Sequence, residues 1–136
     1  MANFKPMKLF LEVLILISFT NLYSQDISGF WSWKYNDGNH MTELILSSND
    51  DGKTYTGYYC SAFYNGKTID CNSSETEIYI KLIRISSNTF SGTFSSPSYD
   101  GTGEIELNYN PESKELFVSI LNDRGLHYFP NKVTFK

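Results

Sequence analysis

The chain after residue 25 is a series of short segments in which apolar and polar residues alternate, and none has the periodicity of a long helix. Alternation with a period of two indicates β-strands with one buried face. Clusters of Asn, Asp, Gly, Ser and Pro separate the segments, so the connections are short turns. This pattern predicts nine strands, at residues 29–35, 40–47, 54–64, 67–71, 77–85, 89–95, 103–109, 115–121 and 127–135.

Short connections favour antiparallel neighbours, so we expect an all-β fold: an up-and-down meander that closes into a small barrel of eight to nine strands. A hairpin pattern occurs twice and places Gly57 and Gly92 in mid-strand between aromatic residues. Glycine weakens a strand unless the strand bends or a neighbour comes close, so both positions favour curved strands. Between Leu82 and Ile83 the apolar phase slips, which predicts a bulge or a bend.

The first 24 residues have the composition of an export signal. Lys5 and Lys8 precede an apolar run at residues 9–19, and small and polar residues follow up to Ser24. The run is far shorter than the roughly 20 residues of a membrane-spanning helix. We therefore expect a signal peptide at 1–24, cleaved near Ser24, and a single domain at 25–136 that is secreted or periplasmic without a stable membrane anchor.

Two cysteines in an exported chain suggest a disulfide. Asn65-Gly66 lies midway between Cys60 and Cys71, and Asn-Gly is the favoured pair for a two-residue hairpin turn. If Tyr64 pairs with Lys67, the register places Cys60 directly opposite Cys71. Directly opposed residues lie within the distance that a disulfide accepts, so we expect this bond to form.

Charge argues against several classes of partner. The formal net charge is −4, and it becomes −5 once Lys5, Lys8 and Glu12 of the predicted signal are removed. An acidic surface repels phosphate, so nucleic acid and anionic membranes are poor partners.

A Gly-x-Trp motif, Gly29-Phe30-Trp31, stands on the first predicted strand, just inside the expected mature N-terminus. It resembles the first strand of the calycin barrels, the group of lipocalins, avidins and their relatives. The segment Thr56-Gly57-Tyr58-Tyr59-Cys60-Ser61 is similar to the second-hairpin strand of avidins. The resemblance implies a barrel closed at one end by Trp31 and a ligand that faces Tyr59 and Ser61. It also implies a basic residue over that Trp, for which the candidates are Arg124 and Lys132.

Aromatic residues share one face on several predicted strands, which is either the lining of a pocket or an ordinary core. The leading hypothesis is a lipocalin-like protein that sequesters a small apolar or aromatic molecule. Its ligand-binding residues would be Trp33, Tyr35, Tyr59, Ser61, Phe90 and Phe94. The alternative is a non-enzymatic interaction protein of the inhibitor or immunity type, with a filled barrel. Its contacts would then come from exposed Tyr58, Tyr64, Tyr99 and Asp100.

The residue inventory does not suggest an enzyme. His40 and His127 are the only histidines, they lie on different predicted strands, and no spacing typical of a metal site or of a serine nucleophile is present. Glu104 and Glu106 point the same way on one strand, as expected of a solvated face. We therefore expect no catalytic residues, no metal and no cofactor.

Overall fold

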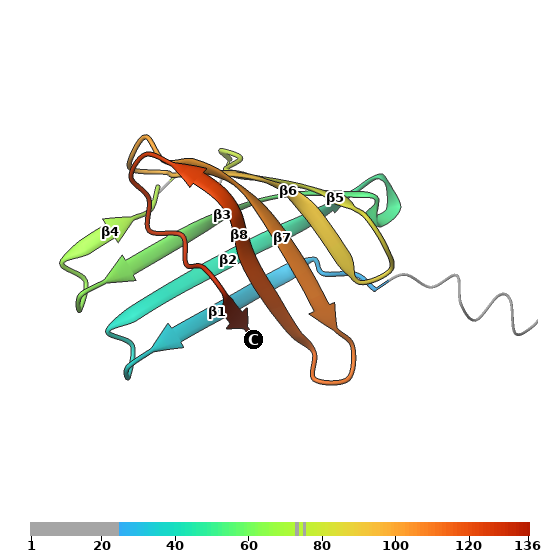
Figure 1. The fold of residues 1–136 in the computed structure, drawn as a ribbon, viewed down its shortest axis with the longest axis horizontal. Helices are drawn as coiled ribbons and strands as arrows, with labels where there is room; N and C mark the ends of the chain where they lie inside the picture. The colour runs from blue at the N-terminus through green and yellow to red at the C-terminus, as the bar shows by residue number, and fades with distance from the viewer. Residues whose placement is uncertain (1–24, 73, 75) are drawn as a thin grey trace, which may run out of the picture.

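The computed structural model describes residues 25–72, 74 and 76–136. The predicted export signal at 1–24 lies outside the described residues. Within them the chain forms nine strands and one turn of 3-10 helix, η1, at Asp50–Gly52 (Figure 1). No described helix is long and apolar enough to cross a membrane. The strands are β1 (Gly29–Tyr35), β2 (His40–Asn49), β3 (Thr54–Phe63), β4 (Thr68–Asp70), β5 (Ile80–Arg84), β6 (Thr89–Ser95), β7 (Thr102–Asn110), β8 (Glu115–Arg124) and β9 (Val133–Phe135).

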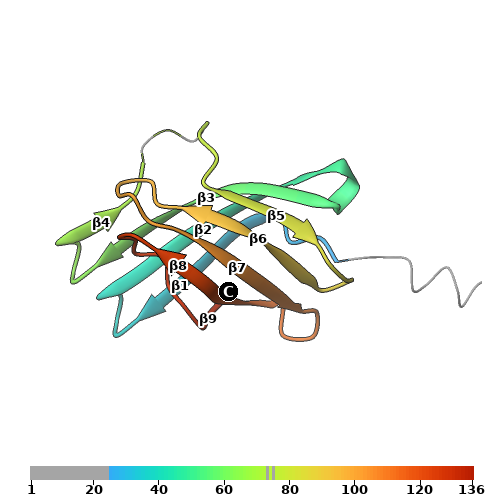
Figure 2. The same ribbon diagram turned by 45° about the horizontal axis from the view of Figure 1, so that its top comes forward.

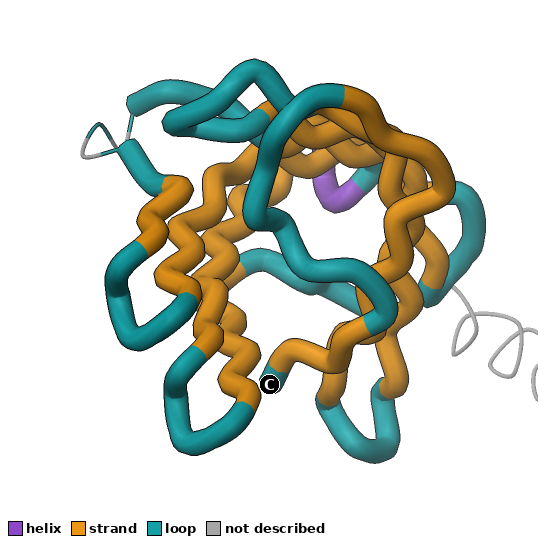
Figure 3. The backbone as a smooth tube through the Cα atoms, turned by 60° about the vertical axis from the view of Figure 1, so that its left-hand side comes forward, coloured by secondary structure: helices purple, strands orange, loops and turns teal. Residues whose placement is uncertain are grey.

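The strands form an antiparallel meander in the order β1-β2-β3-β5-β6-β7-β8-β9, and β4 pairs only with β3. The sheet curls until its two ends meet, where Ser32 and Lys136 exchange two backbone hydrogen bonds of 2.9 Å. The result is a nearly closed barrel, with the strands arranged around a central axis (Figures 2 and 3). The expected all-β barrel is confirmed.

Two strand predictions need correction. The strand expected at 127–135 begins only at Val133, because Pro130 has no N–H for a ladder, Lys132 has φ 55° and Phe129 turns into the core. Residues 125–132, called the crossing segment below, pass in front of the barrel opening (Figure 3). The strand expected at 77–85 begins at Ile80.

The bulge expected near Leu82 and Ile83 is absent. β5 pairs with β3 and β6 without a register shift, Leu82 is buried and Ile83 is 60% exposed. Plain alternation therefore continues, and Ile83 is an apolar residue on the outer face. The irregularity lies elsewhere, between Glu104 and Ile105, where the pairing of β7 with β8 shifts by one residue.

The barrel interior is a continuous apolar core. Most strands of the barrel contribute buried side chains, among them Leu44, Tyr59, Leu82, Phe90, Phe94, Ile105, Leu107, Val118 and Phe135. Gly57 and Gly92 explain the tight curvature, since a Cβ atom would lie 2.1 Å from the Ile45 carbonyl oxygen and 1.8 Å from that of Lys81. A neighbouring strand therefore comes close to both glycines, which is one of the two reasons expected for glycine in mid-strand.

The hairpin of β3 and β4 has the predicted register. Ser61 pairs with Asp70 and Phe63 with Thr68, and Cys60 and Cys71 form a disulfide with Cα atoms 4.3 Å apart. At the turn, the Lys67 N–H donates to the Tyr64 carbonyl oxygen at 3.2 Å. Tyr64, Asn65 and Gly66 all have positive φ, so the last regular pair is Phe63–Thr68 rather than Tyr64–Lys67.

Candidate functional site

The predicted ligand residues do not converge on one cavity. Phe90 lies at the end of the barrel where the described chain begins, Tyr59, Ser61 and Phe94 lie in the interior, and Trp33 and Tyr35 lie toward the opposite end. Four of the six are buried, Trp33 is half-buried and Tyr35 is 61% exposed. The six residues are thus spread from one end of the barrel to the other.

The end near Phe90 is closed by a cation and by the start of the described chain. The Arg84 guanidinium lies 4.5 Å from the centre of the Phe90 ring, and its Nε donates to the Gly52 carbonyl oxygen at 2.8 Å. Its Nη2 donates to the Gln25 carbonyl oxygen at 2.5 Å and to the Tyr55 hydroxyl at 3.2 Å. Ile27, with no exposed surface, fills the space beside them.

Arg84 was missed by the sequence analysis, which offered Arg124 and Lys132 as the basic residue over the first strand. Both of those residues are exposed. The Trp31 indole N–H instead donates to the Ile27 carbonyl oxygen at 3.0 Å, and its ring meets Tyr109 edge-on at 6.0 Å. Regular alternation along β5 points Arg84 inward, like Ile80 and Leu82. This alternation is visible in the sequence and could have identified Arg84 as an inward-facing cation.

The centre of the barrel is filled by rings. Phe129 of the crossing segment stacks on Phe94 with ring centres 4.9 Å apart and meets Tyr59 edge-on at 4.8 Å. All three side chains are at most 4% exposed. The predicted ligand residues Tyr59 and Phe94 are thus brought together, with their rings edge-on at 6.4 Å, and Phe129 of the same chain packs against both.

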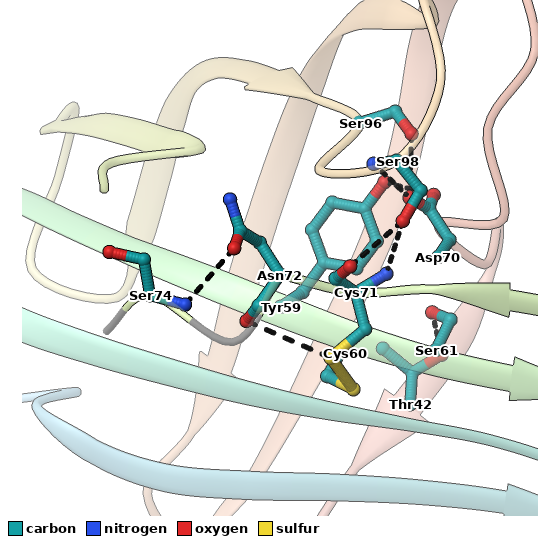
Figure 4. Close-up of a disulfide and its surroundings, with 10 residues drawn as sticks. All are labelled: Thr42, Tyr59, Cys60, Ser61, Asp70, Cys71, Asn72, Ser74, Ser96 and Ser98. Atoms are coloured by element: carbon teal, nitrogen blue, oxygen red, sulfur yellow. Dashed lines mark hydrogen bonds between the residues drawn. A yellow bond between two sulfur atoms is a disulfide. The ribbon is translucent and has the colours of Figure 1, made fainter. Parts of the chain in front are cut away.

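Asp70 organises the opposite end of the interior (Figure 4). This carboxylate has no exposed surface and accepts four hydrogen bonds. The donors are the Tyr59 hydroxyl at 2.6 Å, the Ser96 hydroxyl at 2.6 Å, the Ser98 N–H at 3.1 Å and the Tyr128 N–H at 2.9 Å. Asp70 therefore joins the disulfide hairpin, the β6–β7 connection and the crossing segment.

Two hydroxyls next to this carboxylate are also satisfied internally. Ser61 and Thr42 are buried and share a hydrogen bond of 2.7 Å. Burial, the larger cause, and the hydrogen bond to Asp70 both raise the pKa of Tyr59 well above its usual range. The phenol therefore keeps its proton and remains a hydrogen-bond donor. The two polar side chains that a ligand was expected to contact are hydrogen-bonded to other buried groups, Tyr59 to Asp70 and Ser61 to Thr42.

Three hollows of the described chain lie outside this core. One, of about 590 Å³, lies over β5 to β8; a second, of about 90 Å³, lies over β2 and β3 and includes the half-buried Tyr58. A third, of about 300 Å³, lies at the barrel end beside Arg84 and Asp26. Each is lined mainly by side chains on the outer face or at a barrel end.

A cluster of aromatic side chains covers the end of the barrel near Asp70. It comprises Tyr35, His40, Phe63, Tyr64, Tyr99 and Tyr128, and is called the aromatic rim below. His40 stacks on Tyr35 at 6.0 Å and lies 4.6 Å from Phe63, which lies 5.5 Å from Tyr128. Tyr128 in turn lies 5.6 Å from Tyr99. Trp33 packs against the rim, with its ring 6.2 Å from that of Phe63.

The rim is accessible because its hairpins extend beyond the barrel, as β1–β2 and β3–β4 do in Figure 1. Tyr35 is 61% exposed, Tyr64 53% and Tyr99 38%. The neighbouring Asp100 accepts a hydrogen bond from the Leu126 N–H at 3.0 Å and so fixes the start of the crossing segment. The rim thus contains Tyr64 and Tyr99, which the interaction hypothesis named as contact residues. It also contains Tyr35, which the carrier hypothesis named as a ligand-binding residue.

No family model, curated protein or solved structure matches this chain. Among the described residues, no three His, Cys, Asp or Glu side chains are grouped as a metal site requires. His40 belongs to the rim, and His127 Nε2 lies 2.7 Å from Asp123 Oδ2.

Proposed function

We propose that this chain is an exported, disulfide-bonded, calycin-like barrel that acts without catalysis by binding another protein through its aromatic rim. The observation that carries the proposal is the filled interior. Phe129 packs against both Tyr59 and Phe94, which also contact each other, and Ile27 and Arg84 lie at the other end. These contacts favour the interaction hypothesis over the carrier hypothesis, which needs several hundred cubic ångströms of free interior.

The chemistry of the rim supports a protein partner. Tyrosine offers a large apolar face with a polar tip at a small cost in conformational entropy, and such residues are enriched in the centres of protein interfaces. Aromatic faces also attract Arg side chains of a partner. The acidic character of the domain adds a long-range preference for a basic partner surface. Export to a secreted or periplasmic location is proposed from the sequence, and the disulfide is compatible with it.

The test is a comparison of three proteins used as bait on the envelope or secreted fraction of the host. The rim variant carries Tyr35→Ser and Tyr64→Ser. The control variant carries Phe30→Ser and Ile83→Ser, which remove exposed apolar side chains of similar size far from the rim. We expect one partner to bind the native and control proteins alike and the rim variant at least about tenfold more weakly, as loss of an interface anchor implies.

Native mass spectrometry of the protein from its own host separates this outcome from the carrier hypothesis. A bare mass or a protein complex agrees with the proposal. A small molecule held in the native state and lost on denaturation would contradict it, as would a partner that the rim variant binds with undiminished affinity.

A further inference from the structure

The hollow over β5 to β8 is unrelated to the rim and has features of a binding site. Its volume, about 590 Å³, falls within the range of roughly 300–1,000 Å³ typical of small-molecule sites. These strands lie side by side in Figure 2. Its lining includes Tyr79, Lys81, Thr93, Glu104, Asn122 and Arg124, and it is called the β5–β8 groove below.

The groove follows from the register of the four strands. Lys81 pairs with Thr93, Thr93 with Glu104 and Glu104 with Asn122, so these residues form one row across the sheet. With neighbouring strands about 4.8 Å apart, the row is about 14 Å long. The short Thr93 side chain stands between the long side chains of Lys81 and Glu104, which leaves a hollow between two polar walls.

Two backbone features coincide at this place. The register shift between β7 and β8 falls next to Glu104, and beyond it the Asn122 amide donates to Glu104 Oε2 at 2.7 Å. Bulges of this kind redirect side chains and are frequent near functional sites. At Gly103 a Cβ atom would lie 2.5 Å from the Phe94 ring and 2.6 Å from the Asn122 carbonyl oxygen, so no larger residue fits.

The groove carries two cations, Lys81 and Arg124, and two carboxylates, Glu104 and Asp123, so its formal charges balance, but only the cations lack a partner. Lys81 and Arg124 lie on opposite walls, and neither side chain makes an ion pair or hydrogen bond with a described residue. The carboxylates already have partners, since Glu104 accepts from Asn122 and Asp123 lies beside His127. The remaining carboxylate charge disfavours a multiply charged phosphate, whereas a single carboxylate with neutral hydroxyls suits the two cations and the hydroxyls of Thr93 and Thr102.

We propose that the β5–β8 groove binds a small hydroxylated carboxylate, of which a sugar acid is the simplest example. Arg124 binds the carboxylate with its two-pronged guanidinium, and Lys81 adds attraction as a point charge. Thr93, Thr102 and Asn122 contact the hydroxyl groups of the ligand. This site is separate from the aromatic rim and does not depend on the function proposed for it.

The experiment is an NMR titration of the disulfide-bonded, ¹⁵N-labelled protein with D-galacturonate and, in parallel, with neutral D-galactose. We expect galacturonate alone to give saturable shifts at the amides of Lys81, Thr93, Glu104 and Arg124. Lys81→Met and Arg124→Met should each weaken binding by about tenfold, the size expected for one charge-assisted hydrogen bond, and Arg124→Lys should restore only part of it. Lys67→Met, in the exposed β3–β4 turn, is the matched control and should bind like the native protein.

Thermal unfolding of each variant checks that the exposed substitutions leave the fold intact. The proposal is overturned if galacturonate leaves the groove amides unshifted, if galactose shifts them equally, or if Lys81→Met and Arg124→Met bind as tightly as Lys67→Met.

Discussion

Asp70 is a fully buried carboxylate, and no cation of the described chain forms an ion pair with it. An isolated buried charge is expensive, and it is tolerated only when hydrogen bonds replace the lost water. Here four donors from three separate segments do so. Asp70 is thus the residue on which the closure of this barrel end depends.

Replacing Asp70 with Asn tests this dependence. The amide NH₂ group has to face two donors, either Ser96 with Ser98 or Tyr59 with Tyr128, so at least one pair loses its acceptor. With hydrogen bonds to a charged group worth roughly 1.5–3 kcal/mol each, we expect Asp70→Asn to lower the free energy of unfolding by about 3 kcal/mol. Urea denaturation measures the change. Asp37→Asn, in an exposed turn that Asn tolerates, should change stability by less than about 0.5 kcal/mol; equal effects of both would refute the assigned role.

The sequence contained enough to find Asp70 but not to interpret it. The register set by Asn65-Gly66 and the two cysteines places Asp70 opposite Ser61, and Ser61 was expected to face inward. What could not be foreseen is the origin of the donors. Ser96 and Tyr128 are 26 and 58 residues away along the chain, and they meet Asp70 only because the barrel closes.

At the scale of elements, glycine controls how tightly the two related hairpins curve. Gly57→Ala and Gly92→Ala each place a methyl group about 2 Å from a backbone carbonyl oxygen of the neighbouring strand, which a sheet cannot move aside cheaply. We expect each substitution to cost about 2–3 kcal/mol, at the upper end of overpacking effects. Thermal unfolding followed by circular dichroism is the measurement. Ser91→Ala, beside Gly92 on β6, is the control, and unchanged melting of Gly92→Ala would mean that the strands are not as close as described.

Strand prediction succeeded where turns and alternation agreed, and failed where the chain left the sheet. β1 and β6 have the predicted bounds, and the β3–β4 register followed from one Asn-Gly pair. In residues 127–132 alternation suggested a strand, but Pro130 interrupts the ladder and Phe129 has a better place in the core. Burial of one large ring outweighs a few strand hydrogen bonds, and a local pattern does not report such a competition.

The antiparallel barrel predicted from the sequence left open whether its interior is hollow or filled. Aromatic residues that face inward are compatible with both. The answer depends on the crossing segment, because its Phe129 packs against Tyr59 and Phe94 and completes the core. The candidate ligand residues therefore could be placed on their faces from the sequence, but the Phe129 ring that packs against two of them could not.

Removing that ring gives the sharpest test of a filled barrel. Phe129→Ala should cost about 3–5 kcal/mol, the usual range for a buried Phe, and should leave an apolar cavity. Such cavities stay dry and bind benzene, so benzene should raise the melting temperature of Phe129→Ala and shift the ring signals of Tyr59 and Phe94. Phe117→Ala, on the outer face of β8 at 41% exposure, should be mildly destabilising and unaffected by benzene.

The native protein is the reference for the benzene experiment. If its interior is filled as described, benzene leaves its melting temperature and the Tyr59 and Phe94 signals unchanged, and the search for function stays on the outer surface. Benzene binding inside the native barrel would show that the crossing segment yields to a ligand. The same aromatic walls would then belong to a carrier, with Phe129 as the side chain that the ligand displaces.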